Sequence, residues 1–295
     1  PDPVRLVYEL LDIHGMMLGQ GRLARALRYV EARLLRRTSL VVLSSQAFDT
    51  CYLRPFDLPE VPTLLVENKP FSRAAERPQV NLPGPAPGGL QEGGPLIIGW
   101  FGMLRCRWSL EGLDQMTQAR PGRFRVVLRG RPALDVMGDF HAVIAGNPDL
   151  SFLGAYDWPG DLPDIYAQVD VAWLIDRYQA GQNSDWLLPN RLYEGCLNGA
   201  APVVLAGTEV ARRTAEWHCG IAVAAPEAPA VAAALSALDP DSLAAARRAV
   251  QAIPRDALEM GDAECRHLAM AICGAGNIST SQTVARIAAA PAIVN

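Results

Sequence analysis

Hydrophobic residues recur along this chain in short runs, which polar, glycine-rich or proline-rich segments separate. In the second half, apolar runs with the length of strands alternate with segments of helical periodicity. These runs cover residues 96–101, 124–128, 150–153, 169–174, 202–205 and 221–224. Strands that alternate with helices are typical of βαβ units, so the pattern predicts an α/β fold with a doubly wound parallel sheet.

The first half carries a shorter version of the same pattern. Strands are predicted over residues 4–11, 40–44 and 63–67, with a helix over about 22–37. A stretch rich in Pro and Gly, residues 70–95, has the composition of an interdomain linker or an exposed loop. The sequence therefore predicts an N-terminal domain over 1–85, a second domain over 86–274 and a tail over 275–295.

The predicted helix over 22–37 is both apolar and basic. Its apolar stripe consists of Leu23, Leu27, Val30 and Leu34. Its positive charge comes from Arg22, Arg25, Arg33, Arg36 and Arg37. Such a helix can lie against an anionic membrane surface, or its charges can simply form a solvated face.

Composition narrows the class of protein. A chain of 295 residues can hold two domains with substantial cores, and a net charge of −4 gives no general signature of nucleic-acid binding. The six cysteines are scattered without a C-x-x-C pair, which favours a reducing cytoplasm over a zinc site or a disulfide framework. No signal peptide or run of eighteen apolar residues occurs, so we expect any membrane contact to be peripheral.

The strongest candidate for chemistry is the stretch over residues 183–205. A polar loop leads to Pro189, which suits the first turn of a helix, and Asn198-Gly199 is a common helix end. The apolar run 202–205 follows as a strand. This order predicts a helix N-terminus at the rim of a parallel sheet, where the free N–H groups and the helix dipole favour a phosphate.

Polar side chains on that helix fit a nucleotide. Asn190 and Glu194 are four residues apart and share one face, with Arg191 beside them. An ionised carboxylate accepts two hydrogen bonds at once, which matches a ribose diol. An ordinary ion pair between Arg191 and Glu194 is the alternative.

These residues resemble a known family. The run Pro189-Asn-Arg-Leu-Tyr-Glu-Gly195, followed by Ala200-Ala-Pro202 and a strand, is similar to the donor-binding helix of retaining GT-B glycosyltransferases, in the exopolysaccharide-biosynthesis branch of family 4. The resemblance implies two Rossmann-like doubly wound domains. It also implies that Glu194 binds the ribose of a nucleotide-sugar.

The run over residues 97–109 reads as a strand, a glycine loop and a helix. Arg105 or Arg107 can clamp a diphosphate, because a guanidinium matches phosphate geometry. The run resembles the first strand and loop of the donor domain in the same branch, including Gly102 and the pair Arg105-Cys106. We favour Arg105 as the phosphate ligand, and Arg107 stays open as the alternative.

Two further places follow predicted strands. Tyr156 and Tyr166 lie in a segment that resembles the family's frame around the nucleotide base, although we favour core packing for Tyr166. His14 follows the first strand, and the family's equivalent histidine hydrogen-bonds the donor sugar. Asp176, at the end of another strand, is typical of a turn cap.

The chain also departs from the family. Where the wider family has a first glutamate that contacts the donor sugar, this chain has Trp186, so we expect loop amides near Leu187 and Leu188 to serve instead. Only three strands of the N-terminal domain are found, which makes that domain incomplete. At roughly thirty residues per βαβ unit, on the order of ninety residues are expected before Pro1.

The sequence thus predicts a glycosyltransferase that moves a sugar from a nucleoside-diphosphate sugar to a lipid-linked saccharide or polysaccharide acceptor, with retention. His14 and Arg105 are its candidate catalytic residues. We expect no metal, no cofactor and no nucleic-acid partner, and a place in the cytoplasm at the inner face of the plasma membrane. The alternatives are a sugar-nucleotide epimerase on the same fold and a non-catalytic nucleotide-sugar-binding partner subunit.

Overall fold

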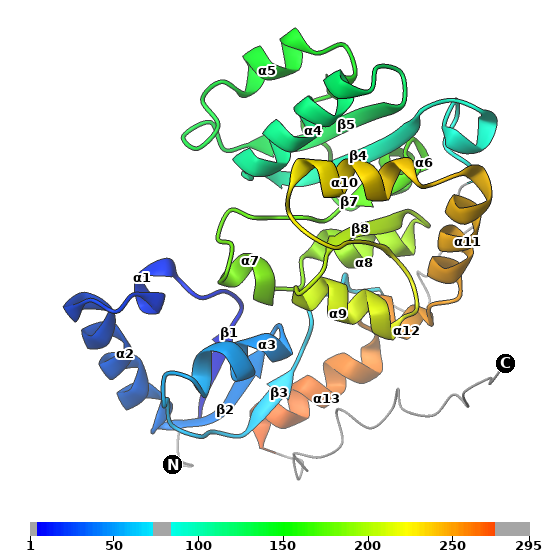
Figure 1. Ribbon diagram of the computed structural model, residues 1–295. Coiled ribbons are helices and arrows are strands. Elements are labelled where there is room, and N and C mark those ends of the chain that lie inside the picture. Colours follow the sequence, from blue (N-terminus) through cyan, green and yellow to red (C-terminus); the bar gives the residue numbers. More distant parts are fainter. Residues whose placement is uncertain (1–4, 73–83, 275–295) are drawn as a thin grey trace, which may run out of the picture. The chain divides into compact units, whose positions relative to one another are not determined.

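The computed structural model describes residues 5–72 and 84–274 (Figure 1). Within these ranges the chain forms two compact units. The first unit takes the residues up to Asn68 together with those from Asp262 onward, and the second runs from Lys69 to Gly261. The predicted tail over 275–295 lies outside the described residues.

The first unit is built on a three-stranded parallel sheet with the order β1-β2-β3. Its strands are β1 (Leu6–Leu10), β2 (Thr38–Leu43) and β3 (Thr63–Leu65). Its helices are α1 (Gly15–Leu18), α2 (Arg22–Leu35), α3 (Gln46–Phe48), the π-helix η1 (Asp49–Leu53) and α13 (Asp262–Cys273). All three strands and the long helix predicted from the first half are therefore present.

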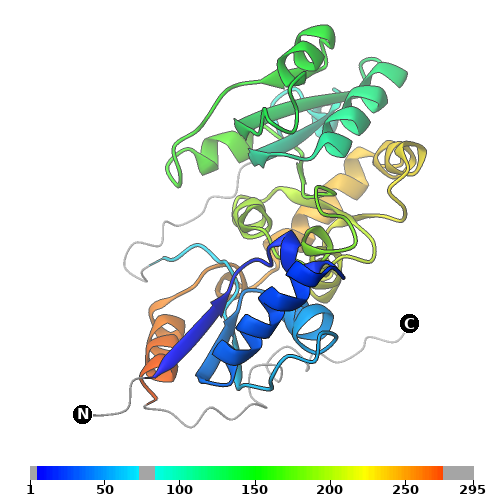
Figure 2. The same cartoon turned by 90° about the vertical axis from the view of Figure 1, so that its left-hand side faces the viewer.

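Helices cover both faces of this sheet (Figure 2). Successive strand residues point to opposite faces, and α13 packs with Leu268 and Ala271 on the face that carries Leu40 and Val42. Helix α2 lies on the other face. The sequence prediction assigned residues 262–273 to the second domain, whereas the structure packs them on the first sheet because their apolar side chains complete its core.

Helix α2 does not bury the apolar stripe that its sequence predicts. Its buried residues are Ala24, Glu31 and Leu35. Leu23 and Val30 are 61% and 55% exposed. The stripe therefore faces away from the sheet, next to the arginines of the same helix.

The second unit contains a six-stranded parallel sheet, which confirms the predicted doubly wound α/β fold. The order is β6-β5-β4-β7-β8-β9. Its strands are β4 (Leu96–Leu104), β5 (Phe124–Pro132), β6 (Leu150–Phe152), β7 (Val171–Trp173), β8 (Ala201–Leu205) and β9 (Ile221–Val223). The direction of winding reverses between β4 and β7, so these two neighbours form the topological switch point of the sheet.

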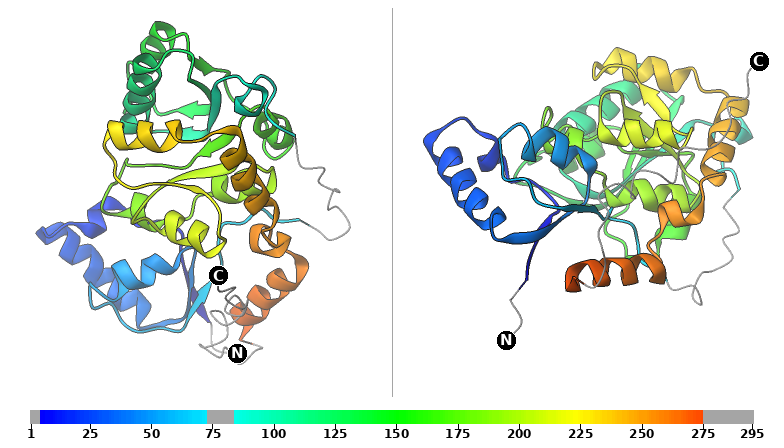
Figure 3. Two further views of the ribbon diagram at one scale, coloured as in Figure 1. Left: turned by 45° about the vertical axis from the view of Figure 1, so that its right-hand side comes forward. Right: turned by 90° about the horizontal axis from the view of Figure 1, so that it is seen from below.

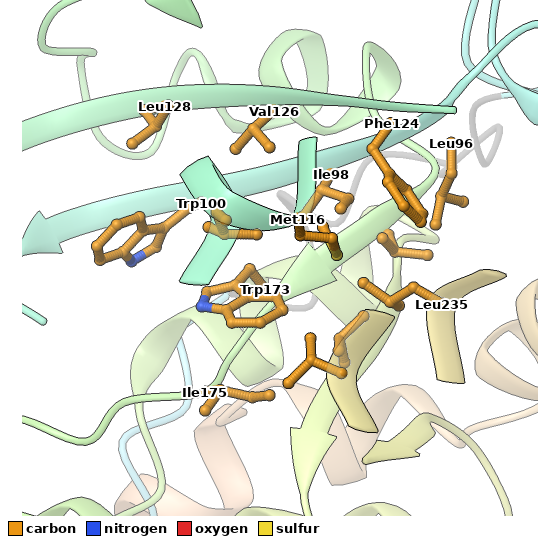
Figure 4. Packing of buried hydrophobic residues seen from close by; sticks show 14 of the residues in the cluster. Leu96, Ile98, Trp100, Met116, Phe124, Val126, Leu128, Trp173, Ile175 and Leu235 are labelled. Carbon is orange, nitrogen blue, oxygen red and sulfur yellow. The ribbon is translucent and has the colours of Figure 1, made fainter. Parts of the chain in front are cut away.

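Helices pack on both faces of this second sheet (Figure 3). They are η3 (Leu90–Glu92), α4 (Arg107–Ala119), α5 (Phe140–Gly146), α6 (Leu162–Ala167), α7 (Asn183–Trp186), α8 (Asn190–Leu197), α9 (Glu209–Glu216), α10 (Ala228–Ser236), α11 (Pro240–Gln251) and α12 (Arg255–Leu258). Figure 4 shows the core on one face, where Ile98 and Trp100 of β4 meet Trp173 of β7 and Met116 of α4. The alternate β4 residues belong to the core on the opposite face.

Strand β4 is longer than predicted. The sequence reading ended the strand at residue 101 and began a glycine loop, but Gly102 continues the ladder opposite Gly130 of β5. Both glycines have positive φ angles, 100° and 128°. A Cβ atom on Gly130 would lie 1.9 Å from the Gly102 carbonyl oxygen, so the two strands pair here only because Gly130 has no side chain.

Candidate functional site

The ends of β4 and β7 bring together residues that are far apart in the sequence. Arg105 comes directly after β4, and Asp176 follows β7 by three residues. Because the two strands are parallel neighbours at the switch point, their carboxyl ends open at the same edge of the sheet. Ligands of doubly wound folds bind at this place.

Asp176 organises this edge. Its Oδ1 accepts hydrogen bonds from the Tyr178 N–H at 2.8 Å and the Ser184 hydroxyl at 3.3 Å. Its Oδ2 lies 3.4 Å from Arg105 Nε and 4.0 Å from Arg191 Nη2. Asp176 is therefore the turn cap that its position predicts, and it is also the anion that holds two arginines side by side.

The two arginines left open by the sequence have different surroundings. Arg105 stays at the Asp176 edge, where its guanidinium lies 5.1 Å from the centre of the Tyr178 ring. Arg107 begins α4 and pairs instead with Asp139 at 2.8 Å and with Glu111 at 3.0 Å, as an exposed surface cluster. The structure thus brings Arg105, and not Arg107, to Asp176 and Arg191.

Helix α8 presents the predicted ribose-binding face. The helix begins at Asn190, with Pro189 as the N-cap one residue before its expected place in the first turn. The helix ends at Leu197 with Asn198 as its C-cap, and Gly199 has a φ of 75°, as expected for the predicted helix end. Asn190 is exposed, whereas Glu194 is 5% exposed.

The Glu194 carboxylate is the most unusual group at the site. Burial raises its pKa above the ordinary value, while a hydrogen bond from Trp158 and the charge of Arg191 act in the opposite direction. The Trp158 indole N–H donates to Glu194 Oε1 at 2.8 Å. Within the described residues, Glu194 Oε2 accepts no hydrogen bond, so this oxygen retains its capacity for a ligand.

Tyr156 lies near this carboxylate, and Gly102 lies near Tyr156. Burial, followed by the Glu194 charge, raises the pKa of Tyr156. The Tyr156 hydroxyl oxygen is 3.9 Å from the position that a Cβ on Gly102 would occupy. Tyr166 is fully buried and packs edge-on against Phe101 with ring centres 5.0 Å apart, so its role in the core needs no ligand.

The remaining predicted residues are placed differently. The Leu187 N–H donates to the Asn183 carbonyl at 2.9 Å, and the Leu188 side chain is buried in the core. The Leu187 amide is thus already engaged. His14 belongs to the first unit, where it is exposed and caps α1 by accepting the Met16 N–H on Nδ1 at 3.2 Å.

Two members of the site were missed by sequence reasoning. Nothing in the local pattern singles out Trp158, because its partner Glu194 lies 36 residues away. The second role of Asp176, which is to hold Arg105 and Arg191, depends on arginines from two different elements.

For metals, no cluster of three or more His, Cys, Asp or Glu side chains suited to an ion occurs within residues 5–72 and 84–274.

No family model matches this chain. The chain is 41% identical over 243 residues to the succinoglycan biosynthesis protein ExoL of Rhizobium meliloti (strain 1021). The chain is an ExoL homologue. The match takes in 82% of this chain and 59% of the ExoL protein, so the chain spans about three fifths of the length of that relative.

Solved structures establish the fold of this ExoL homologue. Anabaena HepE in complex with UDP and glucose is similar with a TM-score of 0.66 and 19% identity, over 92% of this chain and 72% of HepE. Sucrose-phosphate synthase from Thermosynechococcus elongatus gives a TM-score of 0.64 and 18% identity, over 92% and 68% of the two chains. Both are GT-B glycosyltransferases, which confirms the predicted GT-B fold. Retention and membership of family 4 stay predictions.

Proposed function

We propose that this chain is a glycosyltransferase that takes a sugar from a nucleoside-diphosphate sugar, with a UDP-sugar as the first candidate donor. The observation that carries the proposal is the buried Glu194 carboxylate on α8, which keeps one oxygen without a hydrogen bond from the described residues. Homology to a succinoglycan biosynthesis protein and a fold shared with UDP-bound HepE support the choice of donor.

In this proposal Glu194 Oε2 accepts the hydroxyls of the ribose, and Tyr156 lies beside the nucleoside. The diphosphate binds at the edge where Arg105 and Arg191 share Asp176. Arg191 Nε is buried and makes no hydrogen bond within the described residues, which is uncommon for a buried donor. An oxygen of the diphosphate would satisfy such a donor.

The chemistry follows from charge. Negative charge develops on the departing diphosphate, and fixed cations and helix N-terminal amides stabilise the transition state by an amount that is large in a site with little water. The family resemblance adds retention, with the leaving phosphate helping to deprotonate the acceptor, and a hydrogen bond from His14 to the donor sugar. We propose a lipid-linked saccharide or polysaccharide as the acceptor and no metal ion.

The test is calorimetric titration of the chain with UDP, GDP and ADP. We expect one of them to bind, and Glu194→Ala to weaken it about ten- to a hundredfold, because hydrogen bonds to a charged group contribute roughly 1.5–3 kcal/mol. Glu227→Ala is the control, since this exposed glutamate makes no capping hydrogen bond with its side chain. A folded chain that binds none of the three contradicts the proposal, and binding without any transfer would favour a partner subunit.

We also propose that α2 contacts an anionic membrane surface, where a lipid-linked acceptor would reside. Its exposed apolar residues lie next to its arginines, and each basic residue near an anionic surface contributes about 1 kcal/mol. None of the helices in the described part of the chain is long and apolar enough to cross a membrane.

Sedimentation with lipid vesicles tests this contact. The chain should bind vesicles that contain anionic lipid, with an affinity that falls as salt screens the charges. Leu23→Gln combined with Leu34→Gln should weaken binding about tenfold or more. Met270→Gln, which changes an exposed apolar residue of α13, is the control. Equal binding by all three proteins would leave the α2 stripe as an ordinary solvated face.

A further inference from the structure

Trp158 combines two properties that are seldom found together. Its side chain is among the most exposed large hydrophobic groups of the described residues, at 57%. Its only polar atom, the indole Nε1, nevertheless donates to the buried Glu194 carboxylate at 2.8 Å. Burial in a core, the usual source of stability for a tryptophan, therefore does not account for the place of this side chain.

The loop that carries Trp158 is held by its own hydrogen bonds. The Asp157 N–H donates to Asp161 Oδ2 at 2.9 Å, and the Asp161 N–H donates back to the Asp157 carbonyl at 2.9 Å. The Leu162 N–H closes the turn onto the Pro159 carbonyl at 3.2 Å, where α6 begins. The backbone around Trp158 is thus fixed without the indole, which leaves the indole N–H available for a task other than closing the loop.

Glu194 has a reason to need such a partner. The terminal torsion of a glutamate is broad, so a carboxylate with one oxygen held is far better oriented than a free one. The groups that face it are Arg191 from its own helix, Tyr156 from the loop after β6 and Tyr166 from α6. Of these, only Arg191 can carry a positive charge, and Arg191 is shared with Asp176.

We propose that Trp158 is a positioning residue for the nucleotide-sugar donor. Its indole N–H holds Glu194 Oε1, so that Oε2 points to the ribose diol as an ionised acceptor. This inference rests on the proposed function, because it assigns the residue that prepares Glu194 for the ribose. Trp158 acts through Glu194 and takes no part in the transfer itself.

The consequence is a defined dependence on pH. A protonated Glu194 would donate one hydrogen bond and lose acceptor capacity, so donor affinity should fall as the pH drops through the pKa of Glu194. The Trp158 N–H favours the ionised form and lowers this pKa. Without that N–H, the pKa of Glu194 should be higher, and the loss of affinity should begin at a higher pH.

The experiment compares wild type with Trp158→Phe, using the nucleoside diphosphate that wild type binds and its 2′,3′-dideoxy analogue. Trp158→Phe keeps an aromatic ring and removes the N–H. At neutral pH it should bind the diphosphate about tenfold more weakly, and its affinity should fall at a higher pH than that of wild type. Affinity for the dideoxy analogue should hardly change. Combining Trp158→Phe with Glu194→Ala should add little to the loss caused by Glu194→Ala alone, because Trp158 acts only through the Glu194 carboxylate.

Trp217→Phe is the matched control. The Trp217 side chain packs near Tyr193 of α8, but its buried Nε1 makes no hydrogen bond within the described residues. We expect it to leave the pH profile unchanged.

The possible failures are distinct. If wild type binds and Trp158→Phe matches it at every pH, this inference is wrong while the proposed function stands. If Trp158→Phe weakens the diphosphate and its dideoxy analogue equally, Trp158 supports only the loop. If wild type binds no nucleoside diphosphate, the proposed function and this inference fail together.

Discussion

Each unit of this chain buries one glutamate against aromatic side chains, and the two glutamates differ in how their oxygens are used. Glu31 on α2 is 6% exposed, and Glu194 on α8 is 5% exposed. Both Glu31 oxygens accept tyrosine hydroxyls, one from Tyr8 at 2.9 Å and the other from Tyr52. Only one Glu194 oxygen accepts a hydrogen bond from the described residues.

The difference separates a structural carboxylate from a binding one. A buried charge is costly unless hydrogen bonds compensate it, and Glu31 is compensated entirely within its own unit. Burial, together with Glu31 itself, raises the pKa of Tyr8 and Tyr52, so both hydroxyls keep the protons that they donate. Glu194 is buried to the same degree, but only one of its oxygens accepts a hydrogen bond from the described residues. This arrangement costs stability unless a ligand donates a hydrogen bond to the second oxygen.

The largest expected effect is on the stability of the first unit. Glu31→Ala leaves two tyrosine hydroxyls without their acceptor, so the free energy of unfolding should fall by about 3 kcal/mol. Glu194→Ala should change it by less than about 1 kcal/mol. The readout is urea unfolding followed by both tryptophan fluorescence and circular dichroism.

Fluorescence and circular dichroism report different parts of this chain. Every tryptophan lies in the second unit, namely Trp100, Trp108, Trp158, Trp173, Trp186 and Trp217. In Glu31→Ala the circular dichroism should therefore begin to change before the fluorescence does. Tyr8→Phe, which removes one donor, should give a smaller shift of the same kind. If the two unfolding curves of Glu31→Ala coincide with each other and with those of wild type, Glu31 does not stabilise the first unit. The contrast between Glu31 and Glu194 would then be wrong.

The next effect separates the two arginines beyond β4. Arg105→Ala should weaken binding of the nucleoside diphosphate about tenfold or more, because this cation lies with Arg191 at the switch point. Arg107→Ala should weaken it less than about threefold, since an exposed ion pair contributes roughly 0–1 kcal/mol. The affinities of both variants are measured by titration with the nucleoside diphosphate and with the matching nucleoside. The nucleoside should not distinguish the variants, and a larger loss in Arg107→Ala would reverse the assignment.

The smallest effect concerns the pH dependence of stability. Because burial raises the pKa of Glu194 in the folded chain, the folded state binds this proton more tightly than the unfolded state does. The contribution of Glu194 to stability is therefore largest at low pH and declines as the pH rises through the folded pKa. Glu194→Gln removes that decline.

Thermal unfolding of the ligand-free chain measures this effect. The melting temperature of Glu194→Gln minus that of wild type should be more positive at pH 7 than at pH 4. The subtraction cancels the titration of the other carboxyl groups, with Glu227→Gln as an exposed control. A difference that does not vary with pH would indicate that Glu194 is hydrated in the folded chain.

The sequence determined much of this protein through local patterns. Apolar runs placed every strand of both sheets, and the alternation with helices predicted parallel pairing. The pair Asn198-Gly199 ended α8, as expected for a common helix end. These features depend on neighbours within a few residues, so a short window of sequence contains their cause.

The resemblance to GT-B glycosyltransferases also came from the sequence, since its motif lies on one helix. That motif pointed to Glu194 and Asn190. The run over residues 97–109 favoured Arg105 but left Arg107 open, because two arginines two residues apart fit the same loop. The choice depends on which carboxylate each one meets, Asp176 or Asp139, and both lie more than thirty residues away.

Only the tertiary structure decided the remaining features. Gly102 extends β4 because the opposing residue is Gly130, and α13 returns to the first sheet because its apolar side chains complete that core. Trp158 reaches Glu194 because the order β6-β5-β4-β7 brings the loop after β6 and helix α8, which lies between β7 and β8 in the chain, to the same edge. Strand order is set by packing over the whole unit, and no local period of the sequence encodes it.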